Sequence, residues 1–425
     1  MRRIALARRF GIGVVDQILS SLTNFAVTFV VARSAGTRGL GAFGLAFAAY
    51  TIVLGISRAI NTEPMVVRHS TTSKSEWRAA TAAATGSALT VGVLAGFGSL
   101  IASLVFHGTA ADVFLVLAFG FPFLLLQDSW RFAFVAAARP GLAALNDLLW
   151  ALTMLPVVTV LLVSDRATTT NVTFVWVTGA AVAAVGGIVQ ARVQPRPQRL
   201  WAWWRENRDL GPRYVIEFLL SSVGVELVFF ATGALSGLVA VGALRAGWLL
   251  IAPLNVLFMG LMLVAVPEGA RLLQTSFSHL QRGCIGLSVA LTLCVVAWAT
   301  VLLLLPDDAG RELLGENWKA GQAVILPIAL YTVGSTVING ALIGLRALQA
   351  ARRSLAARVV TGPLVLIAGV TGALTSDARG AAWGMAAGNA VAAVFWWRQF
   401  GWAKDEYCSG RLPARADGLP YGAQV

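Results

Sequence analysis

The chain has 425 residues, of which 57% are hydrophobic and only 12% are charged, and its mean hydropathy is +0.74. Soluble globular proteins have about 25% charged residues, so this composition excludes an ordinary soluble protein. Apolar segments of about 20 residues, the length of a transmembrane helix, recur along the whole chain, and the alternating strands of a β-barrel are not found. The sequence therefore predicts an all-α polytopic membrane protein.

About twelve membrane spans are predicted. They lie at 14–32, 40–60, 80–105, 112–135, 142–163, 172–190, 214–235, 239–265, 284–305, 322–344, 358–375 and 381–400. The first apolar run is longer than the hydrophobic region of a typical signal peptide, so we expect an uncleaved first helix. The predicted organisation is a six-helix lobe at 1–190, a cytoplasmic basic linker at 191–213, a second six-helix lobe at 214–400 and a flexible cytoplasmic tail at 401–425.

The basic residues fall mainly on one side of these spans. That side carries 26 of the 33 Lys and Arg residues, and the other side keeps seven. The positive-inside rule then places both termini and the linker in the cytoplasm. The protein is expected to be a multi-pass protein of the inner or plasma membrane. The same bias explains the net charge of +13 and the pI near 10.9, so a nucleic-acid partner is not required.

The linker contains a basic, tryptophan-rich stretch, RLWAWWREN, at 199–207. Two interpretations stay open for it. It is either a short helix that lies in the lipid interface or a solvated basic loop with aromatic residues at the membrane boundary.

The two halves of the sequence resemble each other. Residues 14–43 align without a gap with 215–244, at an offset of 201, and nine of thirty pairs are identical. Asp16 then aligns with Glu217, and Gly36 with Gly237. Each half has an even number of spans, so the repeat is predicted to be parallel, with a pseudo-two-fold axis along the membrane normal and a substrate path between the lobes.

Ionisable residues within the spans mark candidate ion or substrate pathways, because a charge in hydrocarbon is costly. Asp16, Glu217, Glu226 and Asp128 are candidates for ion coupling or for a gate, and Asn24, on the same first span as Asp16, is a candidate for substrate binding. The alternative for Asp16 and Glu217 is hydration at the membrane interface. Asp128 and Arg131 are three residues apart and can pair along one helix face.

Arg245 lies in the eighth span among small residues, and the repeat aligns it with Gly44. Three interpretations of Arg245 remain. Its side chain reaches the outer interface, or it pairs with Glu226 on the preceding helix, or it faces a cavity and offers its planar set of donors to a pyrophosphate. Arg58 and Arg131 are accessory candidates for the same anion.

No catalytic motif stands out in the sequence. Walker A, GxSxG, HExxH and CxxC patterns are missing, and the three cysteines and three histidines have no metal-ligand spacing. We therefore expect neither an enzyme nor a cofactor or metal, and any transport has to use an ion, voltage or substrate gradient.

Two stretches carry a resemblance to a known family. DQILSSLTNFAVTFVVARSAGTRGLGAFGLAFA, at 16–48, resembles the first two helices of polysaccharide flippases in the multidrug/oligosaccharidyl-lipid/polysaccharide (MOP) exporter superfamily. QDSWRFAFVAAARPGLAALNDLLW, at 127–150, resembles their fourth and fifth helices. The resemblance implies two six-helix lobes, alternating access and a lipid-linked saccharide that is turned from the inner to the outer leaflet. Lipid II flippases of the superfamily typically have fourteen helices, which disfavours lipid II as the substrate.

Three functions are weighed on this basis. The first is a flippase for a polyprenyl-pyrophosphate-linked oligosaccharide or a related cell-envelope glycan, with membrane lipids, a coupling cation (H⁺ or Na⁺) and polysaccharide assembly proteins as candidate partners. The second is a cation-coupled drug antiporter of the same fold. The third, a membrane glycosyltransferase, would usually need a large outside loop with catalytic groups, and the loop at 306–321 is short.

Overall fold

The computed structural model describes residues 23–409, except for the side chains of 256, 257, 259, 260 and 263. Within this range the chain is helical and contains no strand. Nine helices of the described part are long and apolar enough to cross a membrane. The predicted all-α polytopic membrane fold is confirmed.

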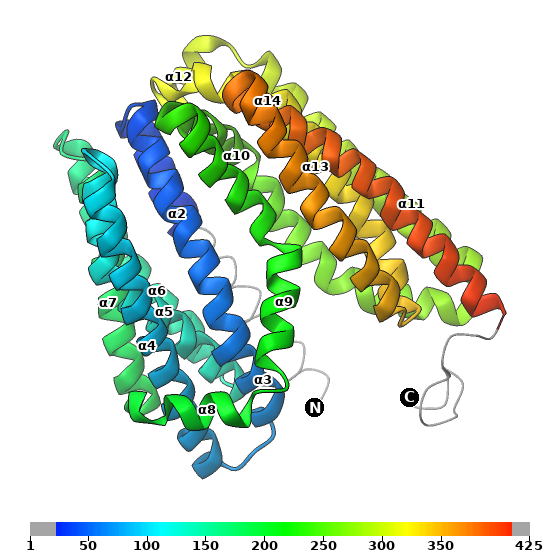
Figure 1. Cartoon of the computed structure of the whole chain (residues 1–425), viewed down its shortest axis with the longest axis horizontal. Helices are drawn as coiled ribbons and strands as arrows, with labels where there is room; N and C mark the ends of the chain where they lie inside the picture. The colour runs from blue at the N-terminus through cyan, green and yellow to red at the C-terminus, as the bar shows by residue number, and fades with distance from the viewer. Residues whose placement is uncertain (1–22, 410–425) are drawn as a thin grey trace. The chain divides into compact units, whose positions relative to one another are not determined.

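The chain divides into two compact units. The first comprises Met1–Leu219 together with Arg311–Asn317. The short second piece belongs with it because Nδ2 of the buried Asn317 donates hydrogen bonds to the carbonyls of Ala32 and Ala35, both at 2.6 Å. After a helical stretch at 23–34, the elements of this half are α2 Thr37–Ser57, η1 Arg58–Thr62, α3 Glu63–His69, α4 Lys74–Val105, α5 Thr109–Ala136, α6 Pro140–Val163, α7 Thr169–Ala191, η2 Pro197–Arg199, α8 Leu200–Glu206 and α9 Gly211–Ser221 (Figure 1).

The second unit comprises Leu220–Gly310 and Trp318–Val425. Within it α10 packs against α11 and α14. The remaining helices are α10 Val223–Thr275, α11 Phe277–Leu304, α12 Asp307–Leu314, α13 Asn317–Ala347 and α14 Ala351–Cys408, and the second part of α12 belongs to the first unit.

Two of the long helices contain a sharp break. In α10 it lies at Gly237, whose φ of 80° suits glycine, and in α14 it lies at Ser376 and Asp377. Both breaks fall between spans that the sequence predicts as separate. Gly36, which the repeat aligns with Gly237, immediately precedes α2, so the aligned glycines mark the same corner in each half. This coincidence supports the internal repeat.

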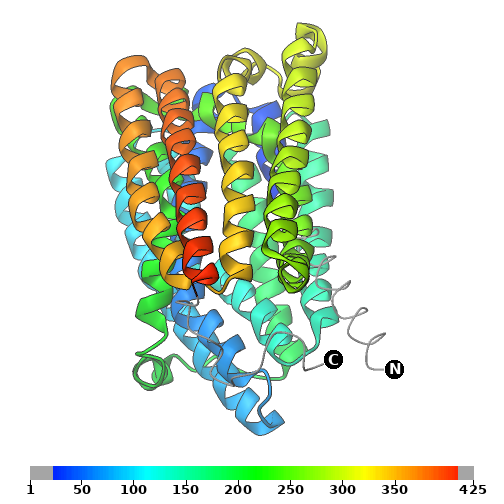
Figure 2. The same cartoon turned by 90° about the vertical axis from the view of Figure 1, so that its right-hand side faces the viewer.

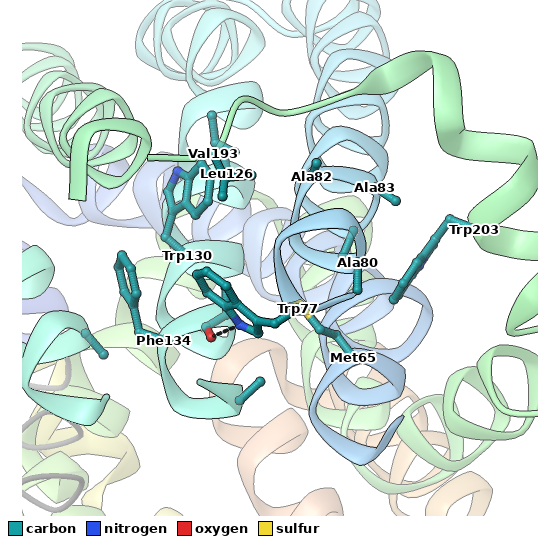
Figure 3. Close-up of a cluster of buried hydrophobic side chains, with 14 of the residues drawn as sticks. Met65, Trp77, Ala80, Ala82, Ala83, Leu126, Trp130, Phe134, Val193 and Trp203 are labelled. Carbon is teal, nitrogen blue, oxygen red and sulfur yellow. Dashed lines mark hydrogen bonds between the residues drawn. The ribbon is translucent and has the colours of Figure 1, made fainter. Parts of the chain in front are cut away.

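The core of the first unit is built around α5, which packs against α4 and α7. Figure 3 shows buried Trp77, Trp130 and Phe134 filling the space between these helices. The two indole N–H groups are satisfied by helix carbonyls, at 3.0 Å each: Trp77 donates to Ala133 and Trp130 donates to Ala184. Large buried rings whose polar atoms are satisfied therefore form the centre of this core.

The two segments of α14 pack as a close helical hairpin, seen as neighbouring orange and red-orange ribbons in Figure 2. Gly380, Gly384 and Gly388 recur every fourth residue and face the first segment. A Cβ built on Gly384 would lie 2.0 Å from the carbonyl oxygen of Ala368, and one on Gly372 would lie 1.9 Å from that of Gly380. Small residues at this spacing let two helix backbones approach directly, as in GxxxG interfaces of membrane helices.

The predicted tail differs from the structure at its start. We expected residues 401–425 to be flexible, but α14 continues to Cys408, so the expectation is wrong for 401–408. The extension is held by contacts with its own unit: Glu406 forms an ion pair with Arg353, and Ala403 is fully buried. Residues 410–425 lie outside the described range.

Candidate functional site

The site begins with an irregularity in the second helix of the chain. The five residues of η1, Arg58–Thr62, form a π-helical turn, in which the N–H of Glu63 bonds to the carbonyl of Arg58 five residues back. Pro64 follows directly, and it has no N–H to give to the carbonyl of Ile60, four residues before it. The wider turn accommodates the proline, and π-helical turns of this kind often occur at functional sites.

Arg58 points into a buried cluster of charged side chains, which we call the charged network: Arg58, Asp128, Arg131 and Asp147. The Arg58 guanidinium donates from Nε to Asp128 Oδ2 at 2.9 Å and from Nη2 to Asp128 Oδ1 at 2.6 Å. Arg131 lies 3.6 Å from Asp128, and its Nε lies 3.0 Å from Asp147 Oδ2. The spacing predicts that Asp128 pairs with Arg131, and this pair is present. It is part of a network that also includes Arg58 and Asp147.

Neutral polar side chains surround the charged network. Gln127 Nε2 donates to Asp147 Oδ1 at 2.7 Å and to Asn146 Oδ1 at 3.2 Å. Asn146 Nδ2 in turn donates to Gln190 Oε1 at 3.0 Å. Tyr50, which is buried, interacts electrostatically with all four charged groups. Buried ionic groups are tolerated only when such partners satisfy them, so the whole cluster acts as one unit.

The charged network has two cations and two anions, so its formal charge is zero. Asp128 and Asp147 are almost fully buried, whereas 34% of the Arg58 side chain is exposed. The bonds to Asp128 use two of the five N–H donors of the guanidinium. The Phe132 ring, 5.3 Å from the guanidinium carbon, also holds it. Arg58 is thus a fixed, partly exposed cation with donors left for a ligand.

The linker is attached to the π-helical turn that carries Arg58. Trp203 of α8 is buried, and its Nε1 donates to the carbonyl of Ile60 at 3.1 Å, the carbonyl that Pro64 cannot serve. Trp204 donates to Ser87 Oγ at 2.8 Å, while Trp201 is 69% exposed. Of the two interpretations of this stretch, the solvated loop is wrong: it is a short helix, with two of its tryptophans bonded to the protein.

We expect Trp203→Phe to destabilise the first unit. The substitution keeps an aromatic side chain but removes the donor to Ile60 and part of the buried ring, and a buried polar group left unpaired costs about 1–3 kcal/mol. Thermal unfolding of the purified protein in detergent measures the change. Trp201→Phe on the same helix is the matched control and should leave the unfolding temperature unaltered, because the Trp201 ring is exposed. Equal unfolding temperatures for the two variants would contradict this role of Trp203.

The remaining candidates of this part of the sequence are Asp16, Glu217 and Asn24. Asp16 lies outside the described residues. Glu217, on α9, is exposed and lies within electrostatic range of Glu63, a carboxylate that our sequence analysis missed. Asn24 is half-buried, and its Oδ1 has no hydrogen-bond partner among the described residues. The equivalence of Asp16 and Glu217 stays a prediction.

In the second unit Glu226 and Arg245, both on α10, lie within electrostatic range of each other. Both side chains are half-buried, and they attract each other electrostatically. Tyr331 lies within electrostatic range of Glu226. Its ring meets that of Trp248 edge to face, with 5.3 Å between the ring centroids. The attraction between Arg245 and Glu226 is consistent with their pairing, and the role of Arg245 in anion binding stays a prediction.

Comparison with known proteins gives a fold but no close relative. No protein-family model matches the chain, and no curated protein matches it. Among solved structures, a multidrug resistance MATE family transporter of the MOP superfamily, in an inward-facing conformation, matches with a TM-score of 0.67 and 14% identity over 93% of this chain and 98% of its own.

The lipid II flippase MurJ, in an inward closed conformation, matches with a TM-score of 0.66 and 11% identity over 93% of this chain and 90% of its own. A MOP superfamily transporter from Pyrococcus furiosus matches with a TM-score of 0.55 and 13% identity over 95% and 96%. The chain therefore has the fold of MOP superfamily transporters.

Proposed function

We propose that the protein is a membrane transporter that flips a polyprenyl-pyrophosphate-linked oligosaccharide, or a related cell-envelope glycan precursor, from the inner to the outer leaflet by alternating access. The observation that carries the proposal is Arg58, a partly exposed guanidinium fixed by two hydrogen bonds within a buried neutral network. A planar guanidinium with free donors suits the oxygens of a pyrophosphate. The resemblance of 16–48 and 127–150 to polysaccharide flippases supplies the substrate class.

Three further groups complete the proposal. Arg131 and Asp128 position Arg58, while Arg245 supplies a second cation in the other unit. Asp16, Glu217 and Glu226 are the proposed sites for a coupling H⁺ or Na⁺ or for gate contacts. The protein would act in the cell membrane with both termini in the cytoplasm, supplying polysaccharide assembly proteins on the outer face.

A cation-coupled drug antiporter is the second candidate. The likeness to a MATE family transporter favours it, as does the half-buried carboxylate Glu226. Proteoliposomes distinguish the two functions. One set holds a polyprenyl-pyrophosphate oligosaccharide with a nitrobenzoxadiazole label, whose outer-leaflet fraction is bleached by dithionite. The other holds ethidium under a proton gradient.

The flippase proposal predicts complete bleaching of the labelled saccharide lipid in vesicles that contain the protein, and bleaching of only the outer-leaflet fraction in empty vesicles. Lipid II serves as a second labelled substrate, to compare head groups. Proton-driven ethidium movement with no change in bleaching would support the antiporter and reject the flippase.

We expect Arg58→Gln to slow the flipping of the labelled lipid strongly. Hydrogen bonds to a charged group contribute about 1.5–3 kcal/mol, and each 1.4 kcal/mol corresponds to about a tenfold change in rate. Arg58→Lys keeps the charge but loses the planar pair of donors, so its rate should lie between those of Arg58→Gln and the parent. Arg271→Gln, which removes an exposed arginine paired with Glu268, is the control and should not slow flipping. Parental rates for Arg58→Gln would exclude a role for Arg58 in substrate binding.

A further inference from the structure

A second group of arginines surrounds a cavity where the linker leaves α7. The cavity has a volume of about 610 Å³ and lies beside the first turns of α4 and the end of α7. Its polar lining consists of Arg78, Arg192, Arg196 and Gln194, and its apolar lining includes Ile188 and Val193. Val193 and Ala82 of this wall appear in Figure 3 beside the buried core. None of these residues belongs to the charged network around Arg58.

The backbone holds this wall in place. Arg192 ends α7 in a left-handed conformation, with φ of 52° and ψ of 41°, which turns the chain back across α4. The N–H of Arg196 then donates to the carbonyl of Ala82 at 2.8 Å. A Cβ on Gly86 would lie 2.3 Å from the carbonyl carbon of Arg196, so only glycine permits this approach. Arg78 Nη2 also donates to the carbonyl of Arg192 at 2.5 Å.

Among residues 23–409, no carboxylate forms an ion pair with the arginines of the cavity. In the described part of the chain, Arg78, Arg192 and Arg196 form no ion pair, and their side chains are exposed. Arg68, in contrast, donates to both carboxylate oxygens of Asp209 at 2.7 Å. The pKa of Asp209 lies below its ordinary value, mainly because the carboxylate accepts a hydrogen bond from its own backbone amide and, to a smaller extent, because of the Arg68 guanidinium. The cavity is thus a site of positive charge that no carboxylate in the described part of the chain pairs with.

An apolar strip leads along α7 to these arginines. Val182, Val185 and Val189 are exposed by 40%, 55% and 72% of their surface, and their spacing of three and four residues places them on one helix face. The strip belongs to a candidate membrane span, Thr169–Ala191, which ends at the residue before Arg192. A ligand that binds both the arginines of the cavity and the valine strip would have an anionic head and an apolar tail.

We propose that this cavity binds the phosphate of an anionic membrane phospholipid, with an acyl chain lying along the valine strip of α7. Basic pockets at the ends of membrane helices attract anionic head groups, and arginine donors match phosphate oxygens. A bound lipid would link the end of α7, the linker and the start of α4. The site is independent of the proposed transport substrate, because it shares no residue with the network around Arg58.

Native mass spectrometry of the purified full-length protein tests the site, with dioleoyl phosphatidylglycerol as the probe and dioleoyl phosphatidylcholine as the neutral reference. The test variant is the triple replacement Arg78→Gln, Arg192→Gln, Arg196→Gln. The control is Arg282→Gln, Arg346→Gln, Arg352→Gln, which removes three exposed arginines of the second unit. Since each arginine near a lipid surface contributes about 1 kcal/mol of attraction, the test variant should bind phosphatidylglycerol about a hundredfold more weakly.

A second variant, Val185→Asn with Val189→Asn, keeps every arginine but makes the strip polar. It should also retain less phosphatidylglycerol than the parent protein. This variant tests the site on its own if the arginine variant does not fold. Three results would overturn the proposal: parental lipid retention by both test variants, an equal loss in the control, or displacement of phosphatidylglycerol by millimolar inorganic phosphate, which would indicate a soluble anion site.

Discussion

Asp128→Asn is expected to abolish transport and to lower the free energy of unfolding by about 3 kcal/mol, the loss typical of a buried ion pair that keeps only one partner. Asp128 accepts two hydrogen bonds from Arg58 and lies 3.6 Å from Arg131. Asparagine has nearly the same shape, so the change removes charge without opening a cavity. The network then carries a net positive charge inside the first unit, and Arg58 loses the partner that fixes its orientation.

Unfolding in detergent and flipping in proteoliposomes measure the two effects separately. Asp405→Asn, which neutralises an exposed carboxylate of α14, is the control and should change neither quantity. The double variant Arg58→Gln, Asp128→Asn restores the charge balance and should recover much of the lost stability, but no transport. Normal transport by the double variant would show that the charged network is purely structural.

Gly384→Ala is expected to disrupt the second unit. It should lower the free energy of unfolding by an amount near the upper end of the roughly 1–3 kcal/mol that overpacking of a core usually costs. The added methyl would lie 2.0 Å from the carbonyl oxygen of Ala368 and 3.1 Å from Cα of Gly369. These are backbone atoms of the facing helix segment, so no side-chain rotation relieves the clash. The two segments of α14 have to move apart, which breaks the contact that their glycines create.

The matched control is Gly401→Ala on the same helix, where an added Cβ meets nothing within 4 Å. It should leave stability unchanged or raise it slightly, because alanine favours a helix more than glycine does. Yield of monodisperse protein and the unfolding temperature in detergent measure both variants. An equally stable Gly384→Ala protein would mean that the segments of α14 are not in direct contact.

The sequence predicts the helices well because hydropathy and corner residues are local signals. The aligned Gly36 and Gly237 lie at helix corners in the structure, as the repeat suggests. The break at Ser376–Asp377 lies in the predicted gap between 358–375 and 381–400. The length of α14 was predicted less well, because Ala403 and Glu406 are held by tertiary contacts that composition does not reveal.

The candidate site is only partly predictable. Asp128 and Arg131 are three residues apart on one helix, so their pairing follows from helix geometry. The bond between Arg58 and Asp128 spans 70 residues, and that between Ile60 and Trp203 spans 143, so only the folded chain shows them. Pro64, just beyond the predicted span at 40–60, is the local signal that was overlooked: a proline that continues a helix has no N–H, so the carbonyl four residues before it needs another donor.

The leaflet distribution of lipid-linked saccharides in cells depleted of the protein tests the proposed function most directly. A membrane-impermeant lectin or glycosidase, added to intact cells, reports the outward-facing fraction. We predict that a polyprenyl-pyrophosphate oligosaccharide accumulates where the probe cannot reach it, and that the parent protein, but not its Asp128→Asn variant, restores access. An unchanged outward-facing fraction, together with increased retention of cationic drugs, would contradict the flippase and identify an antiporter.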